Sequence, residues 1–123
     1  MTRGAVGAGP RQKRAPAVGI PRKLSEARLK QLIEDATVDA YDESEQRLGF
    51  YTMMENDLAL PFETVVLGVE VIVGRIDLTE ADEIVAVCTR GRTRQAISIV
   101  ELPLPVPPPR GAEWIEAYRR WRR

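Results

Sequence analysis

The sequence contains no histidine and a single cysteine, Cys88. Without histidine, the chain lacks the usual general base near neutral pH and the partner of Ser–His and Cys–His nucleophile pairs. One cysteine cannot form an intramolecular disulfide, and a structural zinc site needs more cysteine or histidine than this chain contains. Any bound metal is therefore expected to prefer oxygen ligands, as calcium, magnesium and manganese do.

Long apolar runs and the common catalytic motifs are absent as well. No apolar run approaches the roughly 20 residues that cross a membrane, and nothing resembles a secretory signal. We therefore expect a cytoplasmic protein without a membrane partner. The sequence also lacks GxxxxGK[ST], GxGxxG, HExxH and a nucleophile elbow, so we expect a protein that is not an enzyme.

The 123 residues predict one folded domain that follows an arm. Residues 1–22 contain basic residues and no acid, and are rich in glycine, alanine and proline, so we expect a disordered basic arm. Residues 23–123 are expected to form a single α+β domain. Its predicted parts are helices over residues 25–57, a β segment over 61–102, a proline-rich strap over 103–109 and a C-terminal helix over 112–122.

Two consecutive helices are predicted by capping signals and by apolar residues at helical spacing. Ser25 is expected to cap the first helix, whose apolar stripe begins at Leu29. A break is expected at Tyr41-Asp42, where Asp42 would cap the second helix and Glu45 would reach back as a capping box. In the last predicted helix, three aromatic residues share one face that is expected to dock onto the core, while the arginines face water: Trp114, Tyr118 and Trp121.

From Pro61 onward the apolar pattern alternates as in β-strands. Four strands are predicted, over residues 64–67, 68–76, 83–90 and 94–100. Glycines at 68, 74 and 91 are expected to supply turns or bulges. Such short antiparallel strands favour a fold in which an N-terminal helical pair packs on a small, SH3-like β-barrel, with the proline-rich strap across the barrel and a short C-terminal helix.

The most unusual stretch is Glu34–Glu63, which holds nine acidic residues against one base, Arg47, for a net charge of −8. A solvated helical surface and a site for an oxygen-preferring cation both explain such a concentration of carboxylates. The spacing of an EF-hand loop is absent, because frames that begin at Asp35 or Asp39 lack the glycine at position 6 and the glutamate at position 12. A calcium site of another type remains open, since calcium accepts irregular arrangements of oxygen ligands.

Several short motifs in this stretch resemble those of the CcbP-type family of bacterial calcium-binding proteins. They are Val38–Glu43, Glu45-Gln46, Gly49-Phe50, Met54–Leu58 and Pro61-Phe62. The resemblance extends from about Leu24 to Leu102. It implies a small, non-catalytic, cytosolic protein that binds Ca²⁺ as a buffer or sensor. By this similarity the expected ligands are Asp39, Asp42, Glu43 and Glu45, with Glu55 in second rank.

An alternative is a small interaction module that binds no metal. Its contacts would be the basic arm and the arginines near the last predicted hairpin, Arg90, Arg92 and Arg94. These residues would meet nucleic acid or an acidic protein partner through their positive charge. For the three arginines, a plain solvated turn is the simpler explanation.

Overall fold

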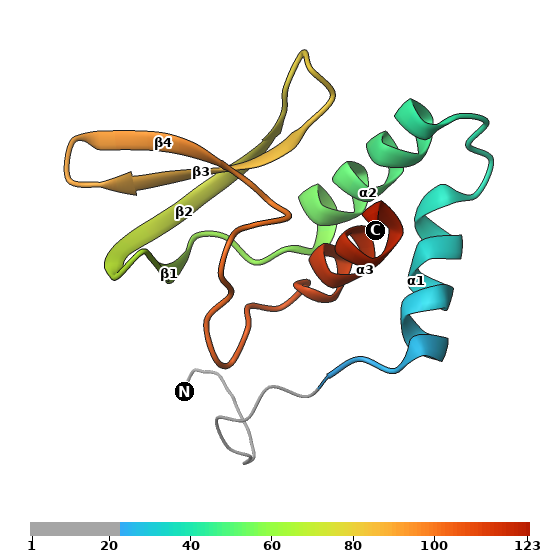
Figure 1. Cartoon of the computed structure of the whole chain (residues 1–123), viewed down its shortest axis with the longest axis horizontal. Coiled ribbons are helices and arrows are strands. Elements are labelled where there is room, and N and C mark those ends of the chain that lie inside the picture. Colours follow the sequence, from blue (N-terminus) through green and yellow to red (C-terminus); the bar gives the residue numbers. More distant parts are fainter. Residues whose placement is uncertain (1–22) are drawn as a thin grey trace.

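The computed structural model describes residues 23–123; the predicted basic arm of residues 1–22 lies outside the described residues. The described chain is α+β, as expected, with three helices and one antiparallel sheet of four strands (Figure 1). The helices are α1 (Glu26–Thr37), α2 (Glu43–Asp57) and α3 (Glu113–Arg122), and the strands are β1 (Phe62–Val66), β2 (Val69–Leu78), β3 (Ile84–Arg90) and β4 (Thr93–Ser98).

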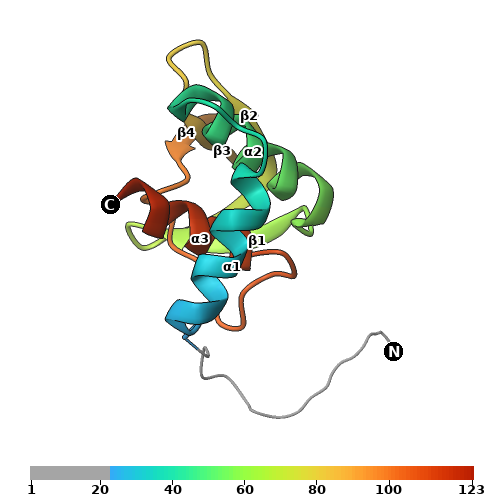
Figure 2. The ribbon, with the colours of Figure 1, turned by 90° about the vertical axis from the view of Figure 1, so that its right-hand side faces the viewer.

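The three helices group together beside the sheet, with α1 lying across α2 and α3 (Figure 2). Helix α1 begins as predicted, because the Ser25 hydroxyl accepts a hydrogen bond from the Arg28 amide at 3.0 Å. Where α2 crosses α1, a Cβ atom on Gly49 would lie 1.9 Å from the backbone oxygen of Ala36. Only glycine allows the two helices to approach this closely.

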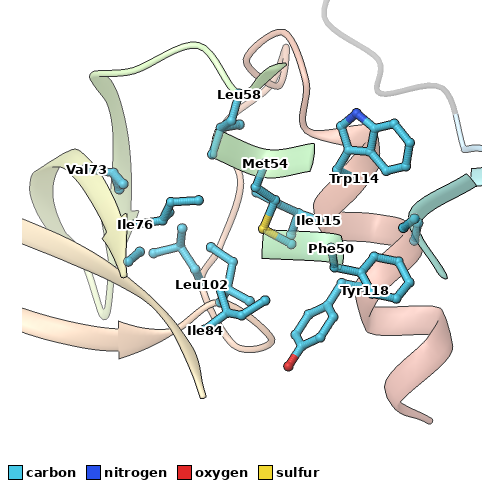
Figure 3. Close-up of a cluster of buried hydrophobic side chains, with 14 of the residues drawn as sticks. Phe50, Met54, Leu58, Val73, Ile76, Ile84, Leu102, Trp114, Ile115 and Tyr118 are labelled. Atoms are coloured by element: carbon cyan, nitrogen blue, oxygen red, sulfur yellow. The ribbon is translucent and has the colours of Figure 1, made fainter. Parts of the chain in front are cut away.

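The sheet is an open meander in the order β1-β2-β3-β4, and β1 does not pair with β4. The prediction of a closed SH3-like barrel is therefore wrong. Closure is not needed to cover the inner face, because helix residues and the segment after β4 pack against it (Figure 3). That face contributes Val73, Ile76 and Ile84 to the same core as Phe50 and Tyr118.

The glycines of the sheet occupy the places expected of them. Gly68 and Gly91 have φ angles of +79° and +58° in the turns that follow β1 and β3, and the register of β2 against β3 shifts between Val73 and Arg75, around Gly74. Positive φ values are unfavourable for residues with a Cβ atom, so glycine suits both turns. In a meander the first and third turns lie at the same end of the sheet, as Figure 1 shows.

Helix α3 covers the core with the aromatic face that its sequence predicts. Trp114 and Tyr118 are buried, and Tyr118 packs against Phe50 of α2 (Figure 3) with ring centroids 5.4 Å apart. The ring centroid of Phe50 also lies 5.3 Å from that of Trp121. The expectation that the arginines of this helix all face water is wrong for Arg119. Its half-buried guanidinium donates to the carbonyls of Ile99 and Leu102, which lie beyond the end of β4.

The proline-rich segment of residues 103–109 forms neither helix nor strand. Since there is no barrel to cross, it runs from the end of the sheet to α3, and the Thr64 hydroxyl of β1 donates to the Pro103 carbonyl at 2.6 Å. Beyond it, Gly111 passes the end of α2 so closely that a Cβ atom would lie 2.3 Å from the Asp57 oxygen. None of the helices within residues 23–123 is long and apolar enough to cross a membrane.

Candidate metal centre

The link between α1 and α2 carries most of the predicted calcium ligands. Helix α1 ends at Thr37, before the predicted break, so Asp39 lies in the link and not on a helical face. Its φ angle of +63° is in the left-handed region, which aspartate tolerates better than most residues. Asp39, Asp42, Glu43 and Glu45 therefore lie within one short, exposed segment, the α1–α2 junction, which we define as residues 38–45.

Two of these carboxylates are already used in helix capping. Asp42 is the N-cap of α2, and its Oδ1 accepts a hydrogen bond from the Glu45 amide at 2.8 Å. Glu45 reaches back through Oε1 to the Tyr41 amide at 2.6 Å, one residue earlier than in a standard capping box. The capping prediction is thus confirmed in its main feature. Each carboxylate keeps a second oxygen that can accept further bonds.

The remaining predicted ligand, Glu55, lies elsewhere. It is ten residues beyond Glu45 on α2, which corresponds to about 15 Å along a helix. There it lies beside Tyr51, whose pKa is raised to about 12 by burial and by the nearby Glu55 carboxylate. The structure therefore groups four of the predicted ligands and separates the fifth from them.

The side-chain chemistry of these residues suits a metal ion, but their arrangement does not form a coordination site. Their oxygens are the ligands that calcium prefers. However, no three Asp, Glu, Cys or His side chains between residues 23 and 123 are arranged to hold an ion. The N-terminus of α2 also carries a partial positive charge, which stabilises Asp42 and Glu45 but opposes a cation. The junction therefore has suitable oxygen atoms but no preformed coordination site.

A second polar site, which the sequence did not indicate, faces the start of α2. The loop between β2 and β3 and the end of α3 border it, and it encloses about 520 Å³. Its lining comprises Glu43, Gln46, Arg47, Ala81, Asp82, Glu83, Trp121, Arg122 and Arg123.

The acids of the β2–β3 loop in this cleft are paired with arginines. Arg47 donates to Asp82 at 2.6 Å and to the Tyr118 hydroxyl at 3.1 Å, while Arg122 lies 3.4 Å from Glu83. Burial alone would lower the pKa of Arg47, but its bonds to Tyr118 and Asp82 outweigh burial and raise it. A divalent cation would have to compete with these guanidinium groups, so the cleft serves to join α2, α3 and the sheet.

The other residues of interest in the sequence, the three arginines and the cysteine, lie on the surface and in the core respectively. Arg90, Arg92 and Arg94 are exposed around the β3–β4 turn, where Arg90 donates to the backbone oxygen of Glu70 at 3.1 Å. Cys88 is buried in β3, and burial raises the pKa of its thiol. A buried thiol with a raised pKa is a poor nucleophile, as expected of a packing residue.

The fold and the junction together define a small α+β protein with an exposed, carboxylate-rich segment between its first two helices. Comparison with protein-family models matches residues 30–122 to the CcbP-type family, which is described as calcium binding. The chain therefore belongs to this calcium-binding family. The match includes the proline-rich segment and α3, which the sequence resemblance left out. Neither the curated proteins nor the solved structures contain a match to this chain.

Proposed function

We propose that this chain is a non-catalytic, cytosolic calcium-binding protein that acts as a buffer or sensor. Its ion would be held at the α1–α2 junction by Asp39, Asp42, Glu43 and Glu45. Membership of a calcium-binding family supports the choice of ion. Glu55, at the other end of α2, is kept as a separate and weaker point of contact.

The observation that carries the choice of site is that the junction acids are not paired with basic side chains, although Glu43 borders the cleft that contains Arg47, Arg122 and Arg123. Neither α1 nor α2 has a basic residue in its last turn, although acids lie at the ends of both. Among the residues that the structure describes, the junction acids make no ion pair within 4 Å, and Arg47 is directed to Asp82 instead. A bound cation would relieve the repulsion between these neighbouring carboxylates.

Calcium coordination at this site would combine the free carboxylate oxygens with backbone carbonyls and water, because calcium takes about six to eight oxygen ligands. Asp39 and Glu43 have no capping bond to lose. They are therefore the residues whose replacement separates calcium binding from folding.

Thermal unfolding of metal-stripped protein with calcium, with magnesium or with chelator tests the proposal. A ligand at one hundred times its Kd stabilises by about 2.7 kcal/mol, which raises the Tm of a domain of this size by about 10–20 °C. We expect such a rise with calcium, and a smaller one with magnesium, because magnesium requires stricter octahedral geometry.

Paired variants locate the site. Asp39→Asn and Glu43→Gln should reduce the calcium-dependent rise in Tm while leaving the Tm in chelator unchanged, since asparagine also tolerates the left-handed conformation of residue 39. Glu101→Gln removes the same charge from an exposed position outside the junction and should leave the rise intact. An equal rise in all four proteins would place the ion elsewhere, and no rise at millimolar calcium would remove the proposed function.

A further inference from the structure

The end of the sheet formed by the β1–β2 and β3–β4 turns has a surface that neither the core nor the calcium proposal explains. We call it the sheet tip, comprising residues 65–72 and 90–94. The two hairpins lie side by side (Figure 1), and the bond from Arg90 to the Glu70 carbonyl joins them. This end of the molecule is directed away from the helices and from the α1–α2 junction (Figure 1).

The apex of the first hairpin is an exposed leucine in an unfavourable conformation. Leu67 is 97% exposed and has a φ of +51°, in a two-residue turn with Gly68. Such turns favour asparagine, aspartate or glycine, because residues with larger side chains resist positive φ. Leu67 contributes nothing to packing at this exposure, so the fold gives no reason for a leucine here.

More apolar side chains surround the apex. Val65, Val69 and Ile72 are each between 42% and 49% exposed. Together with Leu67 they form an apolar ridge around the apex, with Val65 and Ile72 on one face of the hairpin and Val69 on the other. Exposed apolar residues that gather at one place are typical of a contact surface.

The second hairpin supplies positive charge beside this ridge. Arg90, Arg92 and Arg94 are exposed, and within residues 23–123 no carboxylate lies within 4 Å of their guanidinium groups. Glu70 is the acidic residue of the sheet tip, so basic residues predominate there. An apolar ridge beside arginines matches the layered chemistry of an anionic bilayer, which has phosphates at its surface and acyl chains below.

We propose that the sheet tip docks on an anionic lipid surface, with Leu67 inserted between headgroups and the arginines on lipid phosphates. A leucine that protrudes at the turn of a hairpin favours a fluid lipid layer over a protein partner, which would need a matching pocket. The charge distribution supports this orientation, because the acidic junction lies at the other end and is turned away from the bilayer. Surface docking needs no membrane-spanning segment, so it is compatible with the helices of residues 23–123, none of which is long and apolar enough to span a membrane.

Co-sedimentation of the full chain with vesicles in chelator tests this proposal independently of calcium. We expect binding to phosphatidylcholine vesicles that contain phosphatidylserine, little binding to phosphatidylcholine alone, and a decrease in binding with added salt. Leu67→Asn should weaken binding by about tenfold, the lower end of the contribution of a buried leucine. The same variant should keep or raise the Tm, because asparagine suits the turn.

Control variants distinguish the sheet tip from general surface properties. Val38→Asn removes a side chain that is 68% exposed at the opposite end and should leave vesicle binding unchanged. Arg92→Gln with Arg94→Gln should weaken binding by about fivefold per arginine. The matched pair Arg28→Gln with Lys30→Gln, exposed on α1, should have little effect.

Three results would overturn the proposal. Wild-type binding by Leu67→Asn would show that the apex does not insert. Equal losses from the two pairs of charge variants would show that net charge alone, including that of residues 1–22, attracts the vesicles. Tight, Arg92-dependent binding to duplex DNA or RNA without vesicle binding would assign the arginines to nucleic acid.

Discussion

At the scale of single residues, close backbone approaches determine which positions accept no residue other than glycine. Gly49 is the clearest case, because any side chain there would meet the carbonyl of Ala36 on the neighbouring helix. From sequence alone this glycine is expected only to weaken α2, since glycine is about 1 kcal/mol less favourable than alanine in a helix. The contact between α1 and α2 shows the opposite: glycine at this position stabilises the protein, because it lets the two helices pack.

Gly49→Ala should therefore destabilise the protein despite its better helix propensity. Overpacking typically costs about 1–3 kcal/mol, and the obstacle here is rigid backbone, so we expect the Tm to fall by at least about 5 °C. Ser44→Ala, at an exposed position of the same helix, should leave the Tm nearly unchanged. A Tm for Gly49→Ala at or above that of the wild type would mean that the helices do not cross as described.

Single residues also show what sequence patterns can and cannot reveal. The caps at Ser25 and Asp42 were predictable, because a capping side chain bonds only to amides a few residues away. The Arg47–Asp82 pair was not, since its partners are 35 positions apart and only the tertiary fold brings them together. The same applies to Arg119, whose carbonyl partners become available only because β4 ends at Ser98.

At the scale of elements, two of the four acids proposed to bind calcium at the α1–α2 junction also cap α2. Asp42 and Glu45 stabilise the start of α2 through hydrogen bonds, whereas Asp39 and Glu43 take no part in capping. The cap also explains why a motif shared with a calcium-binding family is partly structural. Loss of a capping residue and loss of a calcium ligand should therefore have different effects on stability in the absence of calcium.

Asp42→Ala should lower the free energy of unfolding in chelator by about 0.5–2 kcal/mol, the usual cost of losing an N-cap. Glu45→Gln should cost less, because its amide oxygen can still accept from the Tyr41 amide. Urea unfolding monitored by circular dichroism measures both. If Asp42→Ala and Asp39→Asn cost the same in chelator, the proposed division between capping and ligand residues is incorrect.

Element boundaries were also more accessible to sequence reasoning than the way the elements assemble. The predicted strands overlap all four observed strands, because alternation and glycine turns are local signals. Whether the sheet closes depends on contacts between its first and last strands, on which local alternation has no bearing. The inner face is instead covered by α2, α3 and the segment after β4, and this cover makes an open sheet sufficient.

At the scale of the whole molecule, a few polar contacts join the helices to the sheet. Tyr51 is one of them: its hydroxyl lies 3.4 Å from the Ile76 carbonyl of β2, on the side where Glu55 and Asp77 add negative charge. Burial and these two carboxylates raise the pKa of Tyr51 from 10.0 to about 12. The folded protein thus favours neutral tyrosine more strongly than the unfolded chain does.

This shift predicts a loss of stability at alkaline pH. Because the pKa is higher in the folded state, the contribution of Tyr51 is complete below pH 10 and declines as the pH rises from 10.0 to about 12. The difference in unfolding free energy between the wild type and Tyr51→Phe should shrink across this range. A difference that stays constant from pH 9 to pH 12 would contradict the shift, since effects of other groups cancel in the comparison.

The connectivity of the molecule has a consequence for the order of folding. The β1–β2 and β3–β4 hairpins close through two-residue turns and need no distant partner, so they can form within microseconds. The helical core depends on contacts between remote segments: Arg47 meets Tyr118 over a separation of 71 residues, and Glu26 meets Arg120 over 94. During synthesis, α2 therefore leaves the ribosome before α3, and Phe50 stays exposed until α3 has been made. We expect the nascent chain to be most prone to aggregation and to chaperone binding during this interval, because of its uncovered helices and not because of its sheet.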